Sequence, residues 1–182
     1  MADLNDLYKK GVSSNSDEIK QQYPDTCAIK SQEIIMNSKG FDVSESELRE
    51  EAMQNGWYKP GSGTPFDDTG NLLEIHGLQV RKYEHASLAD IDNELSQGHN
   101  VIVGVDSGEL WNPSPRETFE DIIQGKSADH ALIASGFAID PFTGDKDILL
   151  TDPGTGDICK SYSSEQFKDA WDDSDNFMVS SF

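Results

Sequence analysis

Basic residues are scarce in this chain of 182 residues, where 14 lysines and arginines face 34 aspartates and glutamates. The resulting net charge of −20 repels nucleic acid backbones and anionic membrane surfaces, and it favours basic partners. We therefore expect no nucleic acid partner. The acidity has a second interpretation, a surface that simply keeps the protein in solution, and the composition leaves both interpretations open.

Long apolar runs are also lacking. No segment approaches the roughly 18 apolar residues of a membrane span, and the N-terminal stretch MADLNDLYKKGVSSNSDEIK has no apolar signal-peptide core. We expect no membrane span and a cytoplasmic chain, or one exported without a cleaved signal peptide. Excision from a longer protein would leave no trace in such a sequence.

Motifs for metals, phosphates and serine hydrolases are missing as well. The acidic residues near one turn do not match an EF-hand, the histidines lack HExxH spacing, and the glycines lack the Lys-Ser or Lys-Thr of a phosphate loop. Ser135-Gly136 does not form the GxSxG elbow. We expect no metal and no cofactor. The residues considered are Asp140, Asp145, Asp147, Asp152, Asp157, His76, His85, His99, Gly61, Gly63 and Gly70.

Cysteine is rare too, with two in the chain, and Cys27 occupies a distinctive place. The segment QQYPDTCAIKSQ turns from a polar loop containing Pro24 and Asp25 into an apolar helical pattern, so Cys27 is expected at a helix N-terminus. Unpaired backbone N–H groups and the helix dipole favour a thiolate there. An isolated helical cysteine is more often a small core residue, so Cys27 needs partners before it reads as a nucleophile.

Two downstream residues supply those partners. His130 opens the apolar run in ADHALIASGF, and Asp152 closes the apolar run in DILLTDPGTGD. A cysteine nucleophile needs a base and a third group that fixes the imidazole tautomer, usually from separate elements. A bridge between Cys27 and Cys159 would block the nucleophile, so we expect two free thiols, with Cys159 in a structural strand.

The order Cys27, His130, Asp152, with Gln21 six positions before the cysteine, resembles the papain-like peptidases of the C39 and C39-like family. The resemblance covers roughly residues 21–182 and implies a Cys-His-Asp triad with Gln21, or Gln22 as the fallback, as an oxyanion-hole donor. This chain departs from the family's Asp-Cys-Gly, since Thr26 and Ala28 flank the cysteine and Asp25 is displaced by one position. Asp25 retains the capacity to cap the helix.

The length suits one domain with a single core, preceded by a flexible N-terminal arm over residues 1–20. The domain, residues 21–182, begins with helices and ends with strands, which is the α+β order. It matches the papain-like plan of N-terminal helices packed on a C-terminal antiparallel sheet.

Local signals place the individual elements. Capping boxes at Ser44 with Glu47 and Ser87 with Asp90 predict two helix starts. A short helix is expected over residues 69–76, another over 163–171, and an insertion with about one helical turn over 109–126. Strands are expected over residues 78–83, 100–106, 130–139, 147–151, 157–162 and 177–181.

These observations predict a cysteine peptidase that cleaves a peptide or protein substrate, with a basic substrate favoured by the charge. Two other classes stay open on the same scaffold. One is a different amide chemistry, such as a deamidase, transglutaminase or amidase, and the other is a catalytically inactive binding module.

Overall fold

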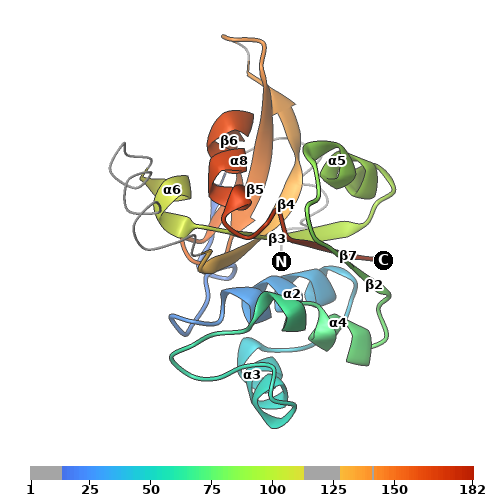
Figure 1. The fold of residues 1–182 in the computed structure, drawn as a ribbon. Helices are drawn as coiled ribbons and strands as arrows, with labels where there is room; N and C mark the ends of the chain where they lie inside the picture. The colour runs from blue at the N-terminus through green and yellow to red at the C-terminus, as the bar shows by residue number, and fades with distance from the viewer. Residues whose placement is uncertain (1–13, 113–127, 141) are drawn as a thin grey trace.

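A twisted antiparallel sheet runs through the centre of the protein (Figure 1). The computed structural model describes residues 14–112, 128–140 and 142–182. Seven strands follow the order β1-β6-β5-β4-β3-β7-β2, and neighbouring strands pair antiparallel. They are β1 (Ser14–Asn15), β2 (Val80–Tyr83), β3 (Asn100–Val105), β4 (His130–Ile139), β5 (Lys146–Asp152), β6 (Asp157–Ser163) and β7 (Met178–Ser181).

Helices cover both faces of the sheet (Figure 1). The layer formed by α2, α3 and α4 lies below it, and α5 and α8 lie above it. The helices are α2 (Cys27–Ser38), α3 (Glu45–Gln54), the 3₁₀ turn η1 (Phe66–Asp68), α4 (Asn71–Ile75), α5 (Leu88–Ser96), α6 (Ser107–Trp111) and α8 (Ser164–Asp172). The predicted arrangement of N-terminal helices against a C-terminal antiparallel sheet is confirmed, and a second helical layer is added to it.

Two apolar cores result, one on each face, so the expectation of a single core was wrong. Strand β3 shows why: Ile102 joins the core below the sheet, whereas Val101 and Val103 join the core above it. Successive side chains of a strand point to opposite faces, so a continuous apolar run serves two layers. Ile29 anchors the lower core and Phe167 the upper one, each fully buried.

Helix starts were predictable from local chemistry. Both capping boxes are present, with Ser44 accepting from the backbone of Glu47 and Ser87 accepting from that of Asp90. The predicted strands lie within two residues of the observed ones, and β4 matches at both ends. In the predicted insertion, α6 ends at Trp111, and residues 113–127 lie outside the described part of the chain.

Residues 14–20 belong to the packed domain, which shortens the predicted N-terminal arm. Ser14 pairs with Ile158 across β1 and β6, and Ile19 is buried in the lower core. The backbone N–H of Gln21 donates to the carbonyl of Pro153. The sequence of this stretch is polar, and its attachment to the domain depends on long-range pairing with β6, which local patterns do not reveal. Residues 1–13 of the predicted arm lie outside the described residues.

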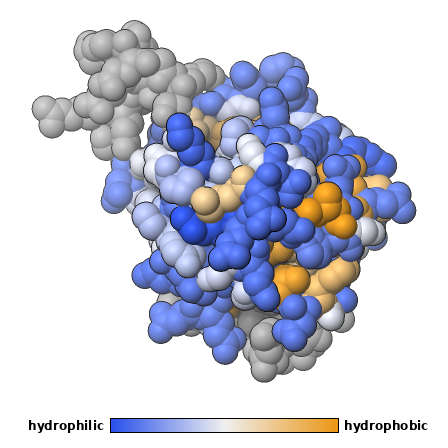
Figure 2. Space-filling model, turned by 90° about the horizontal axis from the view of Figure 1, so that it is seen from below, coloured by the Kyte–Doolittle hydropathy of each residue, from blue (hydrophilic) through white to orange (hydrophobic). Residues whose placement is uncertain are grey.

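Hydrophilic side chains dominate the face formed by the lower helical layer, with apolar side chains gathered toward one side (Figure 2). This is the surface expected from the acidic composition. Within the described ranges, none of the helices has the length and apolar character needed to cross a membrane.

Gly104 on β3 lies against the ring of Phe66. A Cβ atom at this position would stand 2.5 Å from the nearest ring carbon, and the ring itself stacks on Phe177 with centroids 5.3 Å apart. The ring has little freedom to retreat. Glycine is therefore required here by close packing.

We predict that Gly104→Ala lowers the free energy of unfolding by about 1–3 kcal/mol, the usual cost of overpacking a core. The measurement is urea unfolding of the variant and the wild type. In a Phe66→Ala background the same substitution should cost far less, because the obstructing ring is gone. An equal loss in both backgrounds would contradict the packing explanation.

Candidate active site

Cys27 is the first residue of α2, as the sequence predicted. The preceding residue, Thr26, does not cap the helix with its side chain; its hydroxyl donates to the carbonyl of Tyr23 and to Glu45. Asp25 does not cap it either, which corrects that expectation. Its carboxylate instead accepts from the Tyr58 hydroxyl at 2.7 Å and from the Gly61 backbone at 2.6 Å.

His130 and Asp152 meet because they occupy adjoining ends of paired strands. His130 begins β4 and Asp152 ends β5, and antiparallel pairing brings these ends together. His130 Nε2 lies 2.7 Å from Asp152 Oδ1. The same oxygen accepts from the backbone N–H of Gly154 at 2.7 Å, which fixes the carboxylate in the turn after β5.

The sulfur of Cys27 lies against the start of β4. The backbone N–H of Ala131 donates to it at 3.4 Å, and the thiol lies near enough to the His130 imidazole to raise the pKa of that ring. Since Nε2 of His130 faces Asp152, Nδ1 is the ring nitrogen left for the sulfur. The three residues selected from the sequence thus form one chain of contacts, contributed by α2, β4 and β5.

Burial and charge act in opposite directions on this chain. Burial lowers the pKa of His130, but its hydrogen bonds to Asp152 and Cys27 and the charges of both raise that pKa to about 10. Burial raises the pKa of Asp152, yet the hydrogen bond and positive charge of His130, then Trp111 and Gly154, bring it below its ordinary value. His130 therefore holds its proton through the neutral range, beside an ionised Asp152.

Gln21 lies in the wall of the same cleft as Cys27. Its Nε2 donates to the carbonyl of Tyr23 at 2.7 Å, and its Oε1 is buried without a hydrogen-bond partner among the described residues. An amide nitrogen carries two hydrogens, so one bond to Tyr23 leaves a second donor. The fallback residue, Gln22, is exposed, and its backbone N–H is held by Glu45.

The cleft has a volume of about 890 Å³ and is open to solvent. Cys27 and His130 are among the lining residues, together with two groups of small residues. One group comes from the glycine-rich loop before η1, and the other from the turns that flank β4 and follow β5. The lining includes Gln21, Gly61, Ser62, Gly63, Thr64, Phe66, Trp111, Ala128, Ala131 and Gly154.

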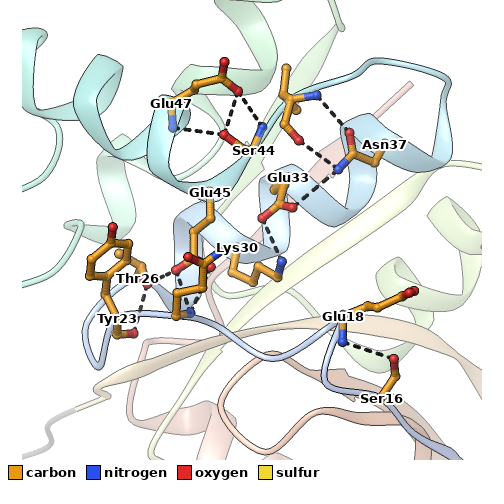
Figure 3. Close-up of polar contacts among 12 residues, drawn as sticks. Ser16, Glu18, Tyr23, Thr26, Lys30, Glu33, Asn37, Ser44, Glu45 and Glu47 are labelled. Atoms are coloured by element: carbon orange, nitrogen blue, oxygen red, sulfur yellow. Dashed lines mark hydrogen bonds and ion pairs between the residues drawn. The ribbon is translucent and has the colours of Figure 1, made fainter.

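Glu45, at the start of α3, supports the loop that carries Gln21 and Cys27. The fully buried carboxylate accepts from the backbone N–H of Gln22 at 3.0 and 2.9 Å and from the hydroxyl of Thr26 at 2.5 Å (Figure 3). One carboxylate therefore holds the residue after Gln21 and the residue before Cys27. Nothing in the sequence indicated this role, because Glu45 reads there as an ordinary first-turn acidic residue.

No three His, Cys, Asp or Glu side chains gather in residues 14–112, 128–140 and 142–182 as a metal site would need. Asp140, one of the acidic residues near the turn that does not match an EF-hand, accepts from the backbone of Phe142 and Thr143 and so shapes that turn.

A sequence profile of the Peptidase_C39 like family matches residues 14–177. The chain belongs to this family. An uncharacterized protein of Mycobacterium tuberculosis is 29% identical over 129 residues, which cover 65% of this chain. The matched part is 53% of that relative, so the chain spans about half the length of the curated relatives it matches.

Solved structures agree with the C39-like assignment. The peptidase domain of Streptococcus ComA, a bifunctional ABC transporter in a quorum-sensing pathway, superposes with a TM-score of 0.59 at 16% identity, covering 90% of this chain and 93% of that one. A double-glycine-motif protease from an AMS/PCAT transporter, in complex with the leader peptide, superposes with a TM-score of 0.57 at 12% sequence identity. The superposition covers 94% of this chain and 92% of that one. At these identities the likeness establishes the fold, and the predicted papain-like α+β class is confirmed.

Trp111 is a site residue of this C39-like domain that sequence reasoning missed. Its indole N–H donates to Asp152 Oδ2 at 2.8 Å, and its ring packs against that of His130 with centroids 5.2 Å apart. Trp111 stands 41 positions before Asp152, in a segment predicted as an insertion. No local sequence pattern links the two positions, so the sequence alone does not pair them.

The two cysteines should differ in reactivity. Cys159 is 1% exposed, and burial raises the pKa of its thiol. Cys27 is half-buried in the cleft wall beside a protonated His130. We predict that iodoacetamide at pH 7 alkylates Cys27 at least about tenfold faster than Cys159, as mass spectrometry of the digested protein would show. Equal labelling, or no labelling of Cys27, contradicts the site.

Glu45→Ala should disturb the site as well as the fold. Its removal leaves the Gln22 N–H and the Thr26 hydroxyl without their acceptor, at a cost of about 1–3 kcal/mol in unfolding free energy. Alkylation of Cys27 should slow at the same time. Glu47→Ala is the matched control on the same helix: it breaks a surface capping box and should leave alkylation unchanged. Equal alkylation rates in both variants would remove Glu45 from the site.

Proposed function

We propose that this protein is a cysteine peptidase that cleaves peptide bonds through a thioester acyl-enzyme. The observation that carries the proposal is the chain of contacts from Cys27 through His130 to Asp152 in the wall of an open cleft. Membership of the Peptidase_C39 like family supports the same chemistry.

The first step makes use of the charge distribution of the site. With His130 protonated, Cys27 reacts as a thiolate paired with an imidazolium, and its sulfur attacks the scissile carbonyl carbon. His130 then gives its proton to the leaving amine as the C–N bond breaks. Asp152 keeps the imidazole in place, since its Oδ1 is itself held by Gly154.

The second step regenerates the enzyme. His130 takes a proton from water, the resulting hydroxide attacks the thioester carbonyl, and the sulfur leaves as the thiolate of Cys27. In both steps the carbonyl oxygen becomes negative. We assign the stabilisation of this oxyanion to two donors, the backbone N–H of Cys27 and the side-chain amide of Gln21. One hydrogen of the Gln21 Nε2 group is bound to the carbonyl of Tyr23, and the other is left for the oxyanion.

The substrate proposed is an extended peptide. Five separate segments line the cleft, from residues 20–28, 61–66, 107–111, 128–131 and 154, and the small residues among them leave room for a polypeptide backbone. The structural relative from an AMS/PCAT transporter is in complex with a leader peptide, which gives a precedent for peptide binding on this fold. The net charge of −20 favours a basic peptide over an acidic one.

Four substitutions test the proposal with a mixed peptide library, whose new amino termini are read by mass spectrometry. Cys27→Ala and His130→Ala should abolish cleavage, and Asp152→Asn should leave a residual rate because nucleophile and base remain. Gln21→Ala should lose about a hundredfold, the effect of one missing oxyanion donor. Gln22→Ala is the matched control and should retain activity.

The alternatives give different products in the same assay. A deamidase or amidase releases ammonia or an amine without new peptide termini, and an inactive binding module leaves the library intact with Cys27 unlabelled by a thiol-directed acyl probe. If Gln22→Ala loses activity and Gln21→Ala keeps it, the oxyanion donor is Gln22 instead of Gln21.

A further inference from the structure

Asp152 has both of its carboxylate oxygens occupied, although only one of them faces His130. Oδ1 accepts from His130 Nε2 and from the Gly154 backbone, each at 2.7 Å. Oδ2 accepts from the indole nitrogen of Trp111 at 2.8 Å. Three donors from three different segments thus fix both the position and the rotation of the carboxylate, which is 1% exposed.

The Trp111 side chain also covers His130. The two rings meet edge to face, with centroids 5.2 Å apart and planes inclined by 63°. Trp111 is 38% exposed and belongs to neither apolar core of the described residues. A large aromatic side chain that is left partly in solvent contributes little to core packing, so its placement calls for an explanation at the site.

The short helix α6 holds Trp111 in this position through contacts on two sides. Toward β4, the Ser107 backbone N–H and hydroxyl donate to Asp129, the neighbour of His130, at 2.9 and 3.1 Å. Toward α8, the carbonyl of Leu110 accepts from Gln166 Nε2 at 2.8 Å. Leu110 itself is fully buried in the upper core. The residue before Trp111 is therefore anchored.

We propose that Trp111 is a positioning residue, which fixes Asp152 through Oδ2 and shields the hydrogen bond between His130 and Asp152 from water. The proposal rests on the function proposed above. A hydrogen bond between charged groups weakens when water reaches it, because the local dielectric constant rises. With Trp111 in place, Asp152 keeps Oδ1 toward His130, and the imidazolium stays beside the Cys27 sulfur.

The test uses iodoacetamide and needs no peptide substrate. Alkylation of Cys27 is followed against pH in a Cys159→Ala background, since the acid-side midpoint of that profile reports how well the imidazolium stabilises the thiolate. The titratable groups in contact with His130 are Cys27 on α2 and Asp152 on β5, while Asp129 beside it is held by Ser107. His130→Ala provides the reference profile of a cysteine without its partner, with a midpoint near the ordinary thiol value of about 8.5.

Trp111→Ala removes both the donor and the cover, and Trp111→Phe removes the donor but keeps a ring. When Asp152 fixes the imidazolium less firmly, the imidazolium stabilises the Cys27 thiolate less. The midpoint of the alkylation profile should therefore rise in both variants, toward the midpoint of His130→Ala. We expect a rise of about one pH unit for Trp111→Ala, equivalent to about tenfold slower alkylation on the acid limb, and a smaller rise for Trp111→Phe. Thermal unfolding of Trp111→Phe should stay close to that of the wild type.

A double-mutant cycle shows whether Trp111 acts through Asp152. In an Asp152→Ala background, Trp111→Phe should have no further effect, because the indole N–H has already lost its acceptor. An unchanged effect in that background would overturn the positioning role. So would a wild-type profile with a low midpoint that neither Trp111 substitution moves.

The same data separate this inference from the proposed function. A wild-type profile identical to that of His130→Ala would overturn both, because no ion pair would exist. A different outcome is a low wild-type midpoint that rises in the Trp111 variants while the peptide library stays uncleaved. That outcome would support the role of Trp111 and contradict only the proposed peptidase activity.

Discussion

The site depends on the packing of the first turn of α2 against the first residues of β4. Both elements carry a small residue there: Ala28 of α2 and Ala131 of β4 are both buried in the lower core. Two polar contacts fix it, from the Ser31 hydroxyl to the Ala131 carbonyl at 3.5 Å and from the Ala131 N–H to the Cys27 sulfur at 3.4 Å. A bulkier residue at either alanine would lift the helix from the strand and separate the sulfur from the imidazole.

An acidic protein must satisfy every carboxylate that it buries, and here three of them organise the fold. Asp152 is held by His130, Gly154 and Trp111, and Glu45 by the loop before α2. Glu94 on α5 joins the last strand: burial raises its pKa, but hydrogen bonds from Ser180, His99 and Tyr83 lower it to about 2. Each buried charge ties together segments that are distant in the sequence.

Much of the fold was predictable because the signals are local. Capping boxes fixed the starts of α3 and α5, and apolar runs fixed the strands. The start of α2 followed from Pro24 and the periodicity after it. The triad candidates were accessible because an isolated cysteine at a helix start, a histidine opening a strand and an aspartate closing one each stand out in their own segment.

What the sequence did not predict depends on long-range contacts. Asp25 reads as a helix cap, but Tyr58 and Gly61 compete for its carboxylate more favourably than the helix does. Residues 14–20 have the polar sequence of a flexible arm. Their place in the domain comes from the pairing of β1 with β6, which is about 140 residues away in the sequence. The role of Trp111 could not be predicted for the same reason. Its partner is chosen by the packing of α6 between β4 and α8, and no spacing rule encodes that packing.

The bridge made by Glu45 has a consequence for the length of the loop before α2. Because a single carboxylate binds Gln22 at one end and Thr26 at the other, the intervening residues close a small ring through a side chain of another helix. A ring of this kind tolerates substitution at its outward-facing members but neither insertion nor deletion, since one residue more or less would break one of its two anchors. The number of residues separating Gln21 from Cys27 is thus determined by the reach of a glutamate side chain.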